Sequence, residues 1–171
     1  MNGLLSLFKS FGYAFSGIFQ ALKYERNMRI HLVCIAYMYS FLLVYDFFEV
    51  SRTQFAVIFL ANAMVMAAEL INTAVERTVD LASDKFTQNG KIAKDTAAGA
   101  VLICAIFAVL AGIAILFQPE AFSKLFEYYV QKPYMFLIFV LSIALSTVFI
   151  FKGFGKNSTQ DNSSKRNKNN E

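Results

Sequence analysis

Four long apolar runs dominate the pattern of hydrophobic and polar positions along the chain. They cover residues 30–48, 54–73, 96–117 and 133–151. A helix needs roughly 20 residues to cross the hydrocarbon layer of a bilayer, and each run approaches that length. The second run is expected to continue as a helix beyond the membrane, to about residue 83. The pattern therefore predicts an all-α integral membrane protein with three core transmembrane helices and an additional fourth.

A shorter, amphipathic pattern precedes the first run. Between residues 3 and 25, apolar side chains recur at alternating steps of four and three, which places them on one stripe of a helix. The stripe consists of Leu4, Phe8, Phe11, Phe15, Ile18 and Leu22. The segment is too polar to span a membrane, so we expect a helix that lies in the cytoplasmic interface. An ordinary amphipathic core helix is the alternative.

The basic residues indicate how the spans are oriented. Of the 16 Lys and Arg residues, 13 precede the first span, lie between the second and third spans or follow the fourth, and 3 lie in the other two connections. Lys and Arg are enriched on the cytoplasmic side of membrane proteins. Both termini and the 77–95 segment are therefore expected in the cytoplasm.

The composition agrees with a membrane protein. The chain is 57% hydrophobic and contains 19 Phe among 171 residues, which is unusual for a soluble domain. The net charge of +4 is modest and the basic residues flank apolar runs, so we expect no nucleic-acid partner. No cleaved signal peptide is evident. We divide the chain into a membrane domain (1–118), an extracytoplasmic loop with the extra transmembrane helix (119–152) and a disordered polar cytoplasmic tail (153–171).

One polar face marks the cytoplasmic end of the second span. At about 100° per residue, Glu69, Asn72, Glu76 and Asp80 fall within about 80° of one another around the helix. Stacked carboxylates at a membrane boundary repel one another, so a metal ion, a basic side chain or a water-filled cavity should compensate them. Glu69 lies deepest and is suited to accept a proton from a hydroxyl. The alternative is a helix end that emerges into water, with Glu76 and Asp80 solvated.

Further charged residues fall on the same side of the membrane. Glu25 ends the interfacial helix, and Lys94 with Asp95 opens the third span, where a helix N-terminus and Lys94 could neutralise a phosphate. Carboxylates from different helices can hold Mg²⁺ together with substrate phosphates. These groups suit phosphoryl transfer from a nucleotide to a hydroxyl in the membrane. A small ion-conducting or transporter subunit could carry the same polar face. His31, the only His, is expected to snorkel or cap rather than to bind a ligand.

The order of these residues resembles that of a known family. AELINTAVERTVD followed by KIAKDTAAGAVL is similar to the prokaryotic diacylglycerol kinases, which are small integral-membrane lipid kinases. The upstream stretch FGYAFSGIFQALKYERNMRIH also fits. Within the family, ERNMRIH looks more like the Gram-positive branch, whose members phosphorylate undecaprenol. The resemblance covers about residues 5 to 118, so the fourth span and the tail lie outside it.

The resemblance implies a homotrimer with composite active sites between subunits, which uses ATP and Mg²⁺ to phosphorylate a membrane lipid alcohol. By that resemblance Glu69 is the general base, and Glu25 and Glu76 hold Mg²⁺. Glu69 and Ala98 are expected at the lipid alcohol. The residues expected around the nucleotide are Tyr13, Glu25, Asn72, Glu76, Asp80, Lys85, Lys94 and Asp95.

We therefore expect an ATP-dependent lipid kinase, multi-pass in the bacterial inner (plasma) membrane, that converts undecaprenol to undecaprenyl phosphate. The first alternative is a diacylglycerol kinase, which would use the same catalytic face with a different acceptor pocket. The second is a non-catalytic membrane subunit in which the polar face mediates assembly or ion passage. Glu25, Glu76 and the Lys94–Asp95 pair argue against the second alternative, because assembly alone requires no site for metal and phosphate.

Overall fold

The computed structural model describes residues 2–83 and 85–153, and within them the chain is helical and contains no strand. Its helices are α1 (Asn2–Tyr24), α2 (Arg26–Val44), α3 (Arg52–Ala82), α4 (Gln88–Leu116), α5 (Pro119–Gln131) and α6 (Pro133–Lys152). Four of them, α2, α3, α4 and α6, are long and apolar enough to cross a membrane. The prediction of an all-α protein with four spans is confirmed. The predicted disordered tail, apart from Gly153, lies outside the described residues.

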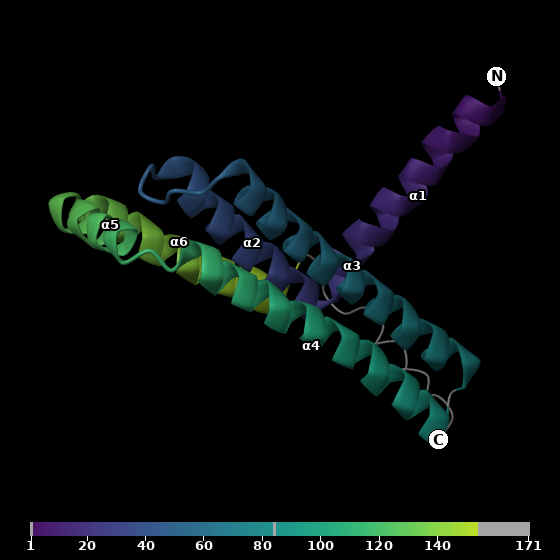
Figure 1. Ribbon diagram of the computed structural model, residues 1–171. Helices are drawn as coiled ribbons and strands as arrows, with labels where there is room; N and C mark the ends of the chain where they lie inside the picture. The colour runs from purple at the N-terminus through teal and green to yellow at the C-terminus, as the bar shows by residue number, and fades with distance from the viewer. Residues whose placement is uncertain (1, 84, 154–171) are drawn as a thin grey trace.

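The α3–α4 hairpin is the longest feature of the molecule, and its tip extends beyond the junction of α1 with α2 (Figure 1). Ser51 precedes α3 and forms a capping box, in which its hydroxyl accepts from the backbone N–H of Gln54 and its own backbone N–H donates to the Gln54 side chain. Thr87 caps α4 by accepting from the amide of Gly90 at 3.1 Å. A Cβ at Gly90 would lie 2.7 Å from the Thr87 hydroxyl and 3.0 Å from Val79, so the close return of the chain requires glycine.

The early start of α4 corrects one expectation. Because Thr87 caps the helix, α4 begins eight residues before the predicted span, and Lys94 and Asp95 lie well inside it. The partial charge of a helix terminus falls off within its first turn. The expectation that Lys94 acts beside a helix N-terminus is therefore wrong.

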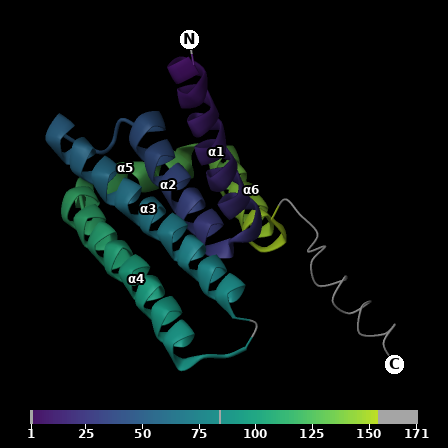
Figure 2. The same ribbon diagram turned by 90° about the vertical axis from the view of Figure 1, so that its right-hand side faces the viewer.

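Helix α1 projects away from the bundle, and its outer end lies far from the other helices (Figures 1 and 2). It meets α2 at Glu25, whose extended backbone forms an elbow between the two helices. The apolar stripe of α1 is exposed along most of its length, whereas Ala21, near the elbow, is only 3% exposed. An exposed apolar stripe on a projecting helix favours the interfacial helix over the core helix.

The segment predicted as a loop after the third span is mostly helical. It forms α5, which begins with Pro119 at a position where proline is favoured. At 13 residues α5 lacks the long apolar run that marks the spans, so the hydropathy pattern missed it. It lies at the end of the bundle opposite the α3–α4 tip (Figure 1).

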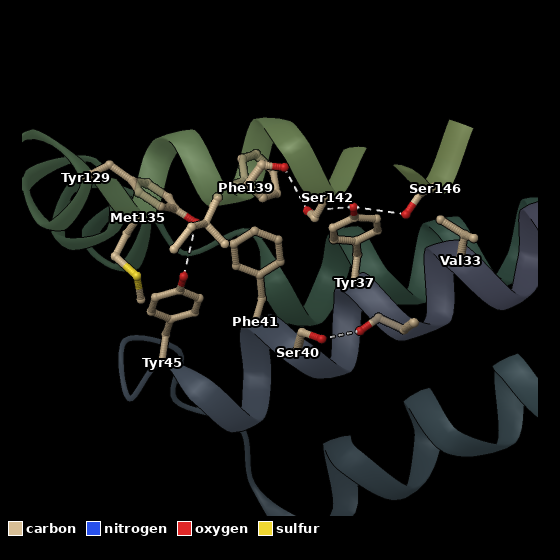
Figure 3. A pocket seen from close by; sticks show the side chains of 12 residues that line it. Val33, Tyr37, Ser40, Phe41, Tyr45, Tyr129, Met135, Phe139, Ser142 and Ser146 are labelled. Atoms are coloured by element: carbon tan, nitrogen blue, oxygen red, sulfur yellow. Dashed lines mark hydrogen bonds between the residues drawn. The ribbon is translucent and has the colours of Figure 1, made fainter. Parts of the chain in front are cut away.

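Helix α6 packs on α2. The Tyr37 hydroxyl lies 2.8 Å from that of Ser142 and 3.2 Å from that of Ser146, and the Tyr45 and Tyr129 hydroxyls lie 3.1 Å apart (Figure 3). Between these contacts α2 and α6, together with Tyr129 of α5, leave an apolar cavity of about 310 Å³. Tyr37 thus joins α2 to α6 at one end of the cavity, and Tyr45, which follows α2, contacts α5 at the other.

Candidate active site

Glu69 is the most enclosed charged residue of the polar face. It lies on α3 against α2 and is 2% exposed. The Nε2 atom of His31 on α2 lies 3.6 Å from its Oε1 atom, and Asn27 lies beside the same carboxyl group. His31 therefore faces the predicted base, and the expectation of a snorkelling or capping histidine is wrong. A lone His in an apolar run carries no periodic signal that could reveal this partner.

One turn further along α3, Asn72 and Glu76 form a pair. The amide of Asn72 donates to Glu76 Oε1 at 3.0 Å, while the Asn72 side-chain oxygen is buried and has no hydrogen-bond partner among the described residues. A buried oxygen without a partner is costly unless another group uses it. The oxygen and the neighbouring carboxylate together are hard donors of the kind that Mg²⁺ prefers.

The elbow brings Glu25 to α3. Its carboxylate lies 3.6 Å from Arg77, which also donates to Gln20 at 3.5 Å. Arg77 directly follows Glu76 in the chain, so Glu25 contacts the residue next to the second predicted metal ligand. Across residues 2–83 and 85–153, no group of three or more His, Cys, Asp and Glu side chains is placed to hold a metal.

A second polar site lies between α3 and α4, near the tip of the hairpin. The Lys94 ammonium donates to Asp80 at 2.5 Å, and the pair lines a cavity of about 340 Å³. Lys85 and Asp95, both predicted around the nucleotide, line the same cavity. Lys91 lines it as well, although the sequence analysis had given it no role. Four of the predicted nucleotide residues are thus brought together with a further cation.

Two predicted residues lie apart from both groups. Tyr13 is 75% exposed on the projecting helix α1, and Ala98 is exposed on α4. The single chain therefore brings most of the predicted site residues into two clusters along α3 and leaves Tyr13 and Ala98 on open faces.

One membrane helix thus carries an enclosed carboxylate, a carboxylate–amide pair and one wall of a lysine-lined cavity. Comparison of the chain with models of known protein families agrees with this arrangement. The family model described as prokaryotic diacylglycerol kinase matches residues 12–116. The chain belongs to this family. As a prokaryotic diacylglycerol kinase family member it is a multi-pass membrane lipid kinase, with ATP as the phosphoryl donor. The alternative of a non-catalytic membrane subunit is thereby set aside.

Two relatives with different named activities are similar to the chain. It is 39% identical over 121 residues to the undecaprenol kinase of Bacillus subtilis, an alignment that covers 70% of this chain and 94% of the relative. It is 40% identical over 118 residues to a diacylglycerol kinase of Synechocystis sp., covering 67% of this chain and 64% of the relative. The family match ends at Leu116, the last residue of α4, and contains every site residue named above. Helices α5 and α6 lie beyond the match.

Proposed function

We propose that this family member phosphorylates undecaprenol, with ATP and Mg²⁺, to give undecaprenyl phosphate and ADP. The observation that carries the proposal is the similarity to an undecaprenol kinase over 94% of that enzyme's length. The ERNMRIH stretch adds support, because it resembles the Gram-positive branch whose members phosphorylate undecaprenol. The similarity to a diacylglycerol kinase makes diacylglycerol the competing acceptor.

Glu69 acts as the general base. Its carboxylate accepts the proton of the lipid hydroxyl while the hydroxyl oxygen bonds to the γ-phosphorus, and the bond from that phosphorus to the β–γ bridging oxygen breaks to release ADP. The 2% exposure of Glu69 keeps bulk water from competing as the acceptor. His31 and Asn27 lie beside the carboxyl group and orient it toward the acceptor.

The residues that would hold Mg²⁺ are Glu25, Glu76 and Asn72, the last through its unpartnered side-chain oxygen. Mg²⁺ held there would neutralise part of the phosphate charge. Arg77 contacts Glu25 and adds a positive charge at the same place. The amide of Asn72 fixes the Glu76 carboxylate by a hydrogen bond, so the oxygens of both side chains are oriented before nucleotide binds.

The nucleotide binds toward the cytoplasmic tip of the hairpin. Asp80 holds the Lys94 ammonium in the cavity, and Lys85 and Lys91 are placed to contact phosphate oxygens. Asp95 lines the same cavity. This order along α3 puts the base nearest the lipid and the nucleotide groups nearest the cytosol.

We further propose that three copies of the chain share their active sites. Helix α1 projects away from its own bundle (Figure 2), and Tyr13 on it is exposed, which supports a role for Tyr13 at the nucleotide of a neighbouring subunit. Ala98, exposed on α4, is placed on a face that an acceptor lipid or a second helix can reach. Both termini lie in the cytoplasm, as the distribution of basic residues predicts.

The decisive experiment offers radiolabelled ATP and Mg²⁺ to the purified protein in lipid nanodiscs with undecaprenol or diacylglycerol. We expect label in undecaprenyl phosphate at a kcat/KM at least tenfold above that for diacylglycerol, a difference of about 1.4 kcal/mol in transition-state stabilisation. Preferential labelling of phosphatidic acid would make the chain a diacylglycerol kinase instead.

A further inference from the structure

A buried arginine connects α6 to the elbow between α1 and α2. Arg29 lies on the first turn of α2 and is 5% exposed. Its guanidinium donates to three backbone carbonyl oxygens: Nε to Ile150 at 3.0 Å, and Nη1 to Leu22 at 3.1 Å and to Lys23 at 2.9 Å. One side chain therefore joins three segments of the chain.

These carbonyls belong to the last turns of two helices. Leu22 and Lys23 lie in the last turn of α1, and Ile150 lies in the last turn of α6. The final four carbonyls of a helix lack partners within the helix, and they give its C-terminus a partial negative charge. Arg29 satisfies such acceptors on both helices at once, for which the planar fork of a guanidinium is well suited.

The end of α6 is shaped for this contact. Gly153 follows the last residue of α6 with a φ of 57°, a conformation that L side chains rarely adopt. A Cβ at this position would lie 3.0 Å from Arg29 Nη1 and 3.2 Å from the Lys23 carbonyl oxygen. The neighbouring Phe151 ring lies 6.0 Å from the guanidinium of Arg26. The chain therefore ends α6 with a glycine where any side chain would press on Arg29.

The elbow that Arg29 holds carries Glu25. On one side of Glu25, Arg29 binds the carbonyls three and two residues before it and links them to α6. On the other side, the Glu25 carboxylate meets Arg77 of α3 at 3.6 Å. The elbow is thus held from α6 and from α3, and α6 lies outside the range that the family model matches.

We propose that the carboxyl end of α6, acting through Arg29, positions Glu25 for binding of metal and nucleotide. Arg29 is a positioning residue in this account, since it contacts backbone and not substrate. The inference rests on the proposed role of Glu25, and it gives the fourth span a part in the active site. If α6 only stabilised the fold, weakening its contact with the elbow would lower thermal stability and leave the metal dependence of transfer unchanged.

Two glycine variants separate these possibilities. Gly153→Ala introduces a methyl group against Arg29, whereas Gly112→Ala in α4 is the matched control, because a Cβ there meets nothing within 4 Å. Two measurements follow on the full-length protein in nanodiscs. The first is the distance distribution between spin labels at Tyr24→Cys and Ala74→Cys, both exposed positions, with Cys34 and Cys104 replaced by Ser. The second is the Mg²⁺ concentration for half-maximal phosphoryl transfer.

We expect Gly153→Ala to broaden the label distances and to raise the half-saturating Mg²⁺ concentration about tenfold, the lower end of what loss of a partner behind a metal ligand costs. Gly112→Ala should change neither. Arg29→Lys serves as a second variant if Gly153→Ala fails to fold: it keeps the charge but loses the fork, and should produce the same two changes more weakly.

A Gly153→Ala protein with wild-type label distances would overturn the proposal, and so would broadened distances with an unchanged Mg²⁺ dependence. The label distances require no catalysis. If the wild-type protein transfers no phosphate to any lipid alcohol, the proposed function fails, and unbroadened distances would separately overturn the positioning by α6.

Discussion

The two clusters along α3 differ in how completely one chain encloses them. The first cluster, where α3 faces α2, contains Glu69, Asn72 and Glu76; Glu69 is 2% and Asn72 7% exposed. The second cluster, between α3 and α4, contains Asp80 and Lys94; the side chain of Asp80 is 69% and that of Lys94 36% exposed. Enclosed polar groups have to be oriented by neighbours during folding, because leaving them unpaired costs stability. An exposed ion pair contributes only about 0 to 1 kcal/mol, so it is better suited to exchange partners with an arriving anion. The difference supports the proposal that the first cluster carries out the chemical step and that the second captures the nucleotide.

The largest expected effect lies in the enclosed cluster. Glu69→Gln keeps the size of the side chain and one acceptor oxygen but removes the proton-accepting carboxylate, so kcat should fall by about 10²- to 10⁴-fold. Steady-state transfer from radiolabelled ATP measures this, with Glu120→Gln on the exposed surface of α5 as the control. A Glu69→Gln protein that keeps more than a tenth of the wild-type kcat would show that another group is the base.

An intermediate effect is expected at the two carboxylates proposed to hold Mg²⁺. Glu76→Ala and Glu25→Ala each remove one carboxylate proposed to hold Mg²⁺, so the half-saturating Mg²⁺ concentration should rise roughly tenfold, which corresponds to about 1.4 kcal/mol. Titration of the transfer rate with Mg²⁺ measures the shift, and Glu127→Ala on α5 is the control. Unchanged titrations for both variants would remove these residues from the metal site.

The smallest effect on the chemical step is expected in the exposed cluster. Lys94→Ala removes the cation that Asp80 holds, so the KM for ATP should rise about tenfold while kcat at saturating ATP stays within about threefold of wild type. Unfolding stability should change by less than about 1 kcal/mol, because the pair is exposed. Lys124→Ala is the control. If kcat falls and KM does not, Lys94 acts in the transition state and the division between the clusters is lost.

Much of the fold and of the site could be predicted from the sequence, for identifiable physical reasons. The spans follow from their apolar length, and the face shared by Glu69, Asn72 and Glu76 follows from helical periodicity. The partners across helices could not be predicted. His31 meets Glu69 and Arg29 meets Ile150 only through tertiary packing, and an Arg beside an apolar run has the same sequence signature whether it orients the span or lies buried.

Local capping limited the prediction in a different way. Thr87 begins α4 in a polar stretch where hydropathy gives no signal, so the extra turns of helix before the third span were missed. Their presence moves Lys94 and Asp95 into the helix and pairs Lys94 with Asp80 across the hairpin. Asp80, Lys85, Lys94 and Asp95 of the α3–α4 cavity were thus indicated by the resemblance, whereas Lys91 and the Lys94–Asp80 contact required the hairpin geometry.

Equilibrium binding of a non-hydrolysable ATP analogue to Glu69→Gln and Lys94→Ala tests the division of labour most directly. The account predicts that Glu69→Gln binds the analogue with a Kd within about threefold of wild type although its kcat falls at least about a hundredfold, and that Lys94→Ala binds it about tenfold more weakly. A Glu69→Gln protein that loses nucleotide affinity as strongly as Lys94→Ala would contradict it, because the enclosed carboxylate would then belong to nucleotide capture and not to the chemical step.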